Sequence, residues 1–173
     1  MPQGERTKLL EAYADAVGAR AEEISEAISR DMGKARWESL AEAGAMKGKI
    51  QISIDAQVER AGGRSHETAF GGSHLTHRPH GVMAVFGPFN FPGHLPNGHI
   101  VPALLAGNTV VFKPSELAPS VARIMVECFE AAGLPDGVLN VVHGGRETGA
   151  ALLDADINGL LFTGSANTGT AFH

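Results

Sequence analysis

The chain has 173 residues, of which 43% are hydrophobic and 19% are charged, and this balance is typical of a globular protein with one sizeable core. The formal net charge of −5 argues against nucleic acid as the main partner, because phosphate binding requires a basic surface. No segment is apolar enough to cross a bilayer and the amino terminus has no apolar signal-peptide region, so we expect a cytoplasmic location and no membrane partner.

Residues 5–60 are predicted to form helices. Apolar residues recur with helical spacing over two segments, and Gly33 suits the end of the second because glycine readily adopts the left-handed conformation found there. A third helix is expected over about 37–58. Its charged residues are interpreted as a solvated surface, and they are Glu38, Glu42, Lys49 and Glu59.

From residue 61 the glycine content rises and the pattern changes. Residues 61–81 are interpreted as a connector that leads into one strand over 75–78. After it, short apolar runs alternate with helical segments. The expected strands cover 82–86, 109–112, 138–142 and 160–162, and the expected helices cover 92–106, 118–132, 148–153 and the last residues. This alternation predicts an α/β fold in which a parallel sheet carries helices on both faces.

Ligands of open parallel sheets bind beyond the carboxyl ends of the strands, so the residues after each strand are the candidates for chemistry. The first strand leads into a stiff loop, Gly87–Pro92, with Asn90 at its centre. The Asn90 amide can donate a hydrogen bond to a developing oxyanion. Capping of the following helix is the alternative role for this residue.

The second strand ends in Lys113, and Glu116 follows three residues later. Both side chains can reach the hydroxyls of a ribose. A carboxylate at this position accepts hydrogen bonds from the diol and repels a 2′-phosphate, which favours NAD over NADP. The alternative is a surface ion pair in which Glu116 complements the dipole of the next helix.

Two glycine-containing turns follow the remaining strands. In residues 143–149 the glycines permit close approach of a ligand to the backbone, although G-x-G-x-x-G is absent and a tight structural turn is an equally good reading. After the last strand, Thr163, Gly164 and Ser165 open a helix and offer backbone N–H groups to a diphosphate. Ser165 as a plain helix cap is the alternative.

Taken together and in this order, these motifs resemble the aldehyde dehydrogenase superfamily. The match runs over 78–169 and rests on Gly-Pro-Phe-Asn-Phe-Pro, Lys-Pro-Ser-Glu and Phe-Thr-Gly-Ser. Residues 77–81 and 93–99 are most similar to the succinylglutamate semialdehyde dehydrogenases within it. The resemblance implies that residues 1–62 are the helical part of a cofactor domain and that 63–173 are its NAD-binding α/β region.

The resemblance also implies an activity, the NAD-dependent oxidation of an aldehyde, N-succinylglutamate 5-semialdehyde, to a carboxylic acid in arginine catabolism. A cysteine thiolate attacks the carbonyl, Asn90 holds the oxyanion as a catalytic residue, and a glutamate activates water. The parent enzyme is expected to be a homo-oligomer. The residues implied in cofactor binding are Phe86, Pro88, Phe89, Lys113, Ser115, Glu116, Gly145, Gly149, Phe162, Thr163, Gly164, Ser165 and Thr168.

The chain departs from the superfamily in its catalytic groups. The catalytic cysteine and the Leu-Glu-Leu-Gly-Gly-type motif of the general base are absent. Cys128 lies on an apolar helix stripe, where burial should raise its pKa and leave it inert. We therefore expect a fragment that cannot turn over aldehyde by itself.

Two other interpretations of the sequence compete with the enzyme, and the first remains open. The chain can be a non-catalytic nucleotide-binding domain, or a pseudogene product, derived from the same family. A metal site of His74, His77 and His80 is disfavoured, because in a strand this spacing directs the side chains to alternating faces. We expect no metal.

Overall fold

Three helices begin the chain and carry the apolar stripes that the sequence predicts. The structure is a computed structural model that describes residues 1–170. Helix α1 spans Gln3–Ala19, α2 spans Ala21–Met32 and α3 spans Arg36–Ala61. Gly33 ends α2 in the left-handed conformation, with a φ of 68°. The helices predicted for residues 5–60 are confirmed.

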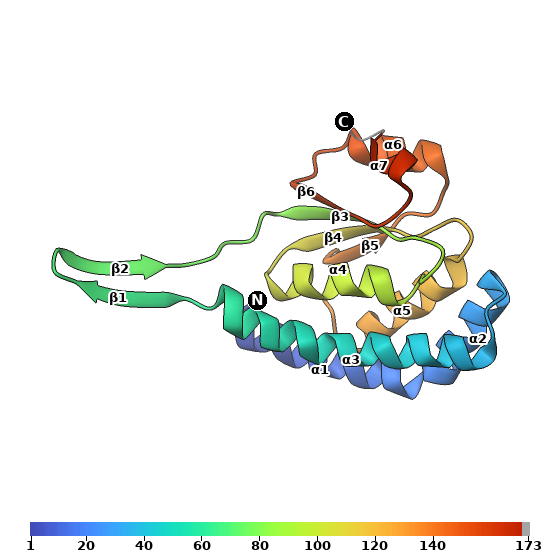
Figure 1. The fold of residues 1–173 in the computed structure, drawn as a ribbon, viewed down its shortest axis with the longest axis horizontal. Coiled ribbons are helices and arrows are strands. Elements are labelled where there is room, and N and C mark those ends of the chain that lie inside the picture. The colour runs from blue at the N-terminus through green and yellow to red at the C-terminus, as the bar shows by residue number, and fades with distance from the viewer. Residues whose placement is uncertain (171–173) are drawn as a thin grey trace.

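A two-stranded antiparallel hairpin follows and projects away from the body of the molecule (Figure 1). Its strands are β1, Arg64–Thr68, and β2, Gly71–Leu75, and every residue in them is exposed. The prediction of a single strand over 75–78 is therefore wrong, since only Leu75 of that segment lies in a strand and residues 76–78 follow β2. Neither strand buries a face, so the sequence lacks the apolar alternation by which strands are recognised.

The main sheet has four strands, all parallel, in the order β5-β4-β3-β6. They span Val82–Phe86 for β3, Thr109–Lys113 for β4, Leu139–Val141 for β5 and Gly159–Phe162 for β6. Each lies where the sequence predicts a strand. Strand β6 pairs with β3 rather than with the preceding β5, so the chain crosses back over the sheet before β6.

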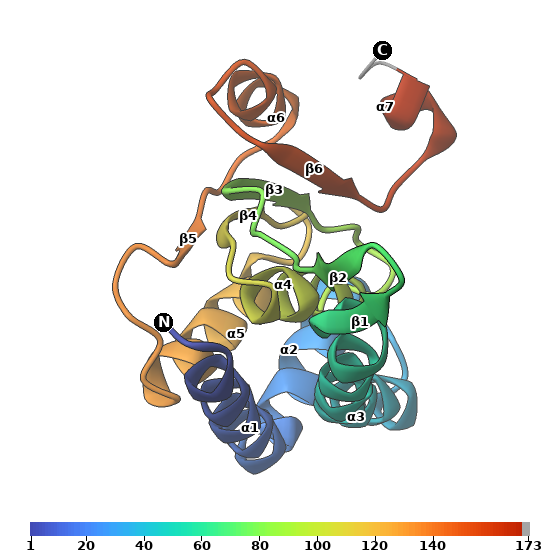
Figure 2. The same ribbon diagram turned by 90° about the vertical axis from the view of Figure 1, so that its left-hand side faces the viewer.

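Helices cover both faces of this sheet (Figures 1 and 2). On the face toward the first three helices lie α4, His94–Leu105, and α5, Pro119–Ala131. On the other face lie α6, Arg146–Leu153, and the short α7, Ala166–Thr170. The predicted fold class, a parallel sheet with helices on both faces preceded by amino-terminal helices, is confirmed.

The two faces differ in the amount of core they contain. The large hydrophobic cluster lies between the sheet and the first five helices, whereas the buried residues of the second are only Ala84, Phe86 and Leu152. Over residues 1–170 there is no helix with the length and apolar character needed to span a membrane. The sheet is therefore anchored mainly through α4 and α5.

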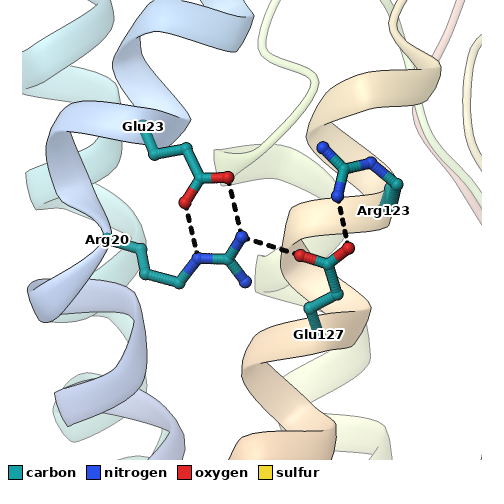
Figure 3. A network of polar contacts seen from close by, with 4 residues as sticks. All are labelled: Arg20, Glu23, Arg123 and Glu127. Carbon is teal, nitrogen blue, oxygen red and sulfur yellow. Dashed lines mark hydrogen bonds and ion pairs between the residues drawn. The ribbon is translucent and has the colours of Figure 1, made fainter.

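A partly exposed ion-pair network connects the junction of α1 and α2 with α5 (Figure 3). The guanidinium of Arg20 binds both carboxylate oxygens of Glu23, and its Nη2 also lies 2.7 Å from Oε2 of Glu127. Arg123 binds the other oxygen of Glu127. The hydrogen bonds from Arg20 hold the pKa values of Glu23 and Glu127 below their usual range.

Candidate cofactor and active site

The carboxyl ends of the parallel strands bring three predicted site residues into one row. Phe86, the last residue of β3, is in register with Lys113 of β4 on one side and with Phe162 of β6 on the other. The amide of Gly87 donates to the carbonyl of Lys113 at 2.9 Å, so the loop after β3 begins beside Lys113. Residues 86, 113 and 162, which are far apart in the sequence, therefore share one edge of the sheet.

Two aromatic rings form an apolar surface at this edge. Phe86 and Phe162 meet edge to face, with ring centroids 6.4 Å apart. Gly149 lies over Phe86, since a Cβ at position 149 would be 3.8 Å from its Cε1 atom. A side chain at Gly164 would overlap the ring of Phe162. The backbone at these glycines therefore packs directly on the two rings.

Lys113 and Glu116 lie together, as the sequence predicts. The Lys113 residue is only 7% exposed, and its Nζ donates to the carbonyl of Pro114 at 3.2 Å. The same Nζ lies 3.8 Å from Oε2 of Glu116, whose side chain is 60% exposed. Gly149 covers the stem of Lys113, because a Cβ there would be 3.7 Å from Cε. The pair is therefore a buried ammonium next to an accessible carboxylate, not a plain surface ion pair.

A cavity of about 370 Å³ adjoins this carboxylate. It lies at the carboxyl ends of β4 and β5 and is lined by Glu116, Pro119, Ser120, Arg123, His143 and Gly144. A larger cavity of about 530 Å³ lies at the opposite end of the sheet, around Arg6 and Thr109. We assign the ligand site to the smaller one, because ligands of open parallel sheets bind at the carboxyl ends of the strands.

Several predicted hydroxyl groups are already engaged within the chain. The Ser165 hydroxyl accepts from the amide of Thr168 at 3.3 Å, so Ser165 does cap α7. The Ser115 hydroxyl accepts from the amide of Leu117 at 3.3 Å. The Thr163 hydroxyl lies 2.8 Å from Nε2 of His99. Burial lowers the pKa of His99, and the positive charge of nearby Lys49 lowers it further. These contacts shape the turns, and diphosphate binding by them stays a prediction.

The Asn90 loop is fixed at its first residue and exposed at its centre. A Cβ at Gly87 would lie 2.9 Å from Cγ of Pro96 and 3.0 Å from Cε2 of Phe112, so the chain passes through a narrow space. Asn90 itself is exposed. The capping alternative is wrong, because the residue preceding α4 is Gly93 and no side chain caps that helix locally.

The backbone amides at the start of α4 bind instead to Glu42 of α3. The sequence predicts Glu42 on the solvated surface of α3, and this prediction is wrong, because its side chain is fully buried. Its Oε1 accepts from the amides of Gly93 at 3.0 Å and His94 at 3.2 Å, and Lys34 Nζ binds its other oxygen at 2.8 Å. The sequence contains one indication of this burial. Glu42 precedes the buried Met46 by one helical turn, so the two side chains lie on the same face of α3. Glu38 and Glu59 are exposed as predicted, and Lys49 is half-buried.

The single cysteine has no access to this edge. Cys128 is fully buried on α5, where desolvation raises the pKa of its thiol. Over residues 1–170, no three His, Cys, Asp or Glu side chains are grouped so that they could hold a metal ion. Of the three histidines considered for such a site, His74 binds the hydroxyl of Ser65 across the hairpin at 2.9 Å.

Comparison with known protein families identifies the family to which this chain belongs. The aldehyde dehydrogenase family matches residues 1–173, which is the whole chain. The chain belongs to the aldehyde dehydrogenase family. The resemblance inferred from the strand-end motifs is thereby confirmed.

Among the curated members of the aldehyde dehydrogenase family, two are highly similar to this chain. N-succinylglutamate 5-semialdehyde dehydrogenase 2 of Caulobacter vibrioides is 60% identical over 171 residues, which is 99% of this chain and 35% of that protein. N-succinylglutamate 5-semialdehyde dehydrogenase of Salmonella typhimurium is 56% identical over 173 residues, again 99% and 35%. The chain thus spans about a third of the length of these relatives.

Solved structures of two dehydrogenases share the fold over almost the whole chain. The NAD⁺ complex of an aldehyde dehydrogenase from Bacillus cereus aligns with a TM-score of 0.92 at 29% identity, over 99% of this chain and 36% of that chain. An NADP-dependent glyceraldehyde-3-phosphate dehydrogenase from Bacillus halodurans, complexed with NADP, aligns with a TM-score of 0.91 at 32% identity, over 99% and 38%.

Proposed function

We propose that this chain is the cofactor-binding part of an NAD-dependent aldehyde dehydrogenase that converts N-succinylglutamate 5-semialdehyde to N-succinylglutamate in arginine catabolism. The observation that carries the proposal is the convergence of the Asn90 loop and the Lys113–Glu116 pair at one edge of the sheet. The names of the most similar relatives support the substrate. Solved neighbours that bind NAD or NADP support a nicotinamide cofactor.

The residues at this edge fit a dinucleotide. The Glu116 carboxylate is accessible beside a cavity, and it can accept hydrogen bonds from a ribose diol while Lys113 donates one. Its negative charge would repel a 2′-phosphate, which favours NAD. Gly149 and Gly164 lie directly on the two aromatic rings, so the turns that contain them are held at the same edge of the sheet. When bound, NAD supplies the hydride acceptor.

Within this mechanism the chain itself provides an oxyanion donor. Asn90 is exposed at the centre of a loop whose root is held by Gly87, and its amide would stabilise the charge that develops on the carbonyl oxygen. The nucleophile must come from elsewhere in a full-length enzyme, because Cys128 is buried and its thiol has a raised pKa. The isolated 173-residue chain should therefore form no thioester and turn over no aldehyde.

The proposed substrate carries carboxylates, which require cationic partners. Lys49 of α3 is half-buried, and none of the ion pairs found within residues 1–170 involves it. A Cβ at Gly98 would be 3.6 Å from its Cε, so Lys49 lies against α4, the helix that the Asn90 loop enters. We assign Lys49 to the carboxylate end of the substrate.

Two predictions about the whole protein belong to this proposal. A homo-oligomer is supported by the hairpin, which exposes all residues of both strands and the side chain of Phe70 at its turn. A cytoplasmic location stays a prediction. A non-catalytic nucleotide-binding protein is the alternative function.

Calorimetric titration of the 173-residue chain with NAD and with NADP tests the cofactor site. Glu116→Ala should weaken NAD binding about tenfold and reduce the preference over NADP, because it removes a charged hydrogen-bond acceptor. Glu130→Ala, which removes an exposed carboxylate on α5, is the matched control and should change neither affinity.

Activity is tested in a chimera in which this chain replaces the corresponding segment of the Caulobacter vibrioides relative. NADH formation from N-succinylglutamate 5-semialdehyde is expected. NAD binding without any turnover by the folded chimera would favour the non-catalytic alternative.

A further inference from the structure

We propose that the buried Lys34–Glu42 ion pair is a positioning device for the Asn90 loop, so that it acts on catalysis through the placement of the Asn90 amide. The inference rests on the oxyanion role proposed above for Asn90. Neither charged residue lies at the cofactor edge, and they come from the junction of α2 with α3 and from α3 itself.

Glu42 holds the segment that follows Asn90 by its backbone. Its carboxylate has no exposure, and it accepts from two successive amides, those of Gly93 and His94. The first amides of a helix have no partner within the helix and lie at the positive end of its dipole. A buried carboxylate from another helix satisfies them here, 51 residues away in the sequence. The start of α4 is thus tied to α3.

Lys34 holds the loop before α4 through the side chain of Phe91. Its Nζ lies 2.8 Å from Oε2 of Glu42 and 3.8 Å from the ring centroid of Phe91, the residue directly after Asn90. This distance is within the range of a cation–π interaction. One ammonium group therefore neutralises the buried carboxylate and holds the residue next to the proposed oxyanion donor.

Close packing leaves this segment little freedom to shift. A Cβ at Gly93 would lie 2.5 Å from Sδ of Met46, one turn after Glu42, so the loop backbone lies directly on α3. Further along α4, the side-chain amide of Asn97 donates a hydrogen bond to the backbone carbonyl of Met46 at 2.9 Å. The loop after β3 is therefore fixed at Gly87 on one side and by Lys34 and Glu42 on the other.

The expected signature is a selective loss of turnover. Removal of an oxyanion donor costs about 10²–10³ in kcat, so displacement of the donor should cost a part of that factor. We expect Lys34→Met to lower kcat about tenfold or more. The KM for NAD should stay within about twofold, because Lys113 and Glu116 lie on a different loop.

The test is a double-mutant cycle in the chimera with the Caulobacter vibrioides relative. Lys34→Met and Glu42→Gln are made alone and together with Asn90→Ala. If the pair acts through Asn90, Lys34→Met should change kcat by less than about twofold once Asn90 is alanine, because coupled residues are not additive. Lys34→Arg retains a cation over Phe91 and should restore most of the turnover.

Arg20→Met is the matched control, since it removes an interhelical ion pair that does not contact the loop (Figure 3). It should lower the melting temperature slightly while kcat stays within about twofold, because the pair is partly exposed and distant from the loop. An equal loss of kcat from Lys34→Met with and without Asn90 would overturn the inference, as would a parallel rise in the KM for NAD. A chimera that never oxidises the aldehyde contradicts the proposed function instead.

Hydrogen exchange in the 173-residue chain provides a readout that needs no activity. In Lys34→Met, the Gly93 and His94 amides should exchange about tenfold faster or more, while the β3 amides stay protected. Unchanged exchange at both amides in a folded variant would contradict the positioning role.

Discussion

The hydroxyl of Tyr13 in α1 donates a 3.0 Å hydrogen bond to the side-chain oxygen of Asn97 in α4. Both residues are fully buried. The Asn97 amide nitrogen binds the carbonyl of Met46 in α3, so a single asparagine connects three helices. The Tyr13 ring also has an apolar contact, because it stacks on the ring of Phe129 in α5 with centroids 3.6 Å apart. Tyr13 thus supports α4 from the side opposite the sheet.

Tyr13→Phe should lower the free energy of unfolding by about 1–3 kcal/mol, because the Asn97 oxygen would stay buried without a donor. Urea denaturation followed by circular dichroism measures the change. Gln51→Ala, which removes an exposed side-chain hydrogen bond to Asp55, is the control and should have a much smaller effect. A Tyr13→Phe midpoint equal to that of the unmodified chain would show that Asn97 finds another donor.

Gly87→Ala should destabilise the chain by about 1–3 kcal/mol, since the new methyl group would meet Pro96 and the fully buried Phe112. Gly44→Ala is a matched control in the interior of α3, at an exposed position where a Cβ meets nothing within 4 Å. That change should stabilise the helix by about 0.5–1 kcal/mol. The two variants are compared by thermal unfolding, and stabilisation by both would refute the tight passage at Gly87.

The Arg20 network should make stability depend on pH in a defined direction. Its hydrogen bonds lower the pKa values of Glu23 and Glu127 in the folded state, so their contribution is present above the usual carboxylate range and is lost as pH falls through the lowered values. Because these side chains are partly exposed and screened by solvent, the difference between the unmodified chain and Arg20→Met should be about 1 kcal/mol or less at pH 7.

Urea titrations between pH 7 and pH 3 check this dependence. The difference from Arg20→Met should shrink as the pH falls toward 3, because protonation of the two carboxylates weakens their bonds to Arg20. A difference that grows on acidification would mean that the network opposes folding.

Lys49→Met in the chimera should raise the KM for N-succinylglutamate 5-semialdehyde about tenfold, because a charge-assisted hydrogen bond to a carboxylate would be lost. The KM for an uncharged aldehyde of similar length should stay unchanged. Lys47→Met removes an exposed ammonium group two residues earlier and is the control. Equal changes for both aldehydes would assign Lys49 to a structural role.

The sequence predicts local features of this chain well and long-range ones poorly. Helix stripes such as Tyr13 and Val17, and short apolar strands such as Val82–Phe86, follow from periodicity, which burial on one face imposes. The hairpin was missed because neither strand has a buried face. The burial of Glu42 is not predicted because charged residues on a helix are normally exposed. Its one-turn spacing to Met46 is a weak local sign, and its partners at Gly93 and His94 are distant in the sequence.

The candidate site was predictable in its parts but not in its assembly. The motifs around Asn90, Lys113 and Ser165 each indicate a ligand loop from local composition. Their proximity depends on the strand order, in which β6 crosses back to pair with β3. No local pattern specifies that crossover, since the partner of β6 is set by packing across the whole sheet.

The position of β6 also constrains the sequence of events in folding. Asn158, just before β6, accepts a hydrogen bond from the amide of Val82 across 76 residues, whereas Asn108 binds the amide of Gly81 across only 27. Closing the longer loop costs more chain entropy, and little core on that face compensates for it. The helical layer with β3 and β4 can therefore condense first, and the edge that unites Phe86 with Phe162 is completed last.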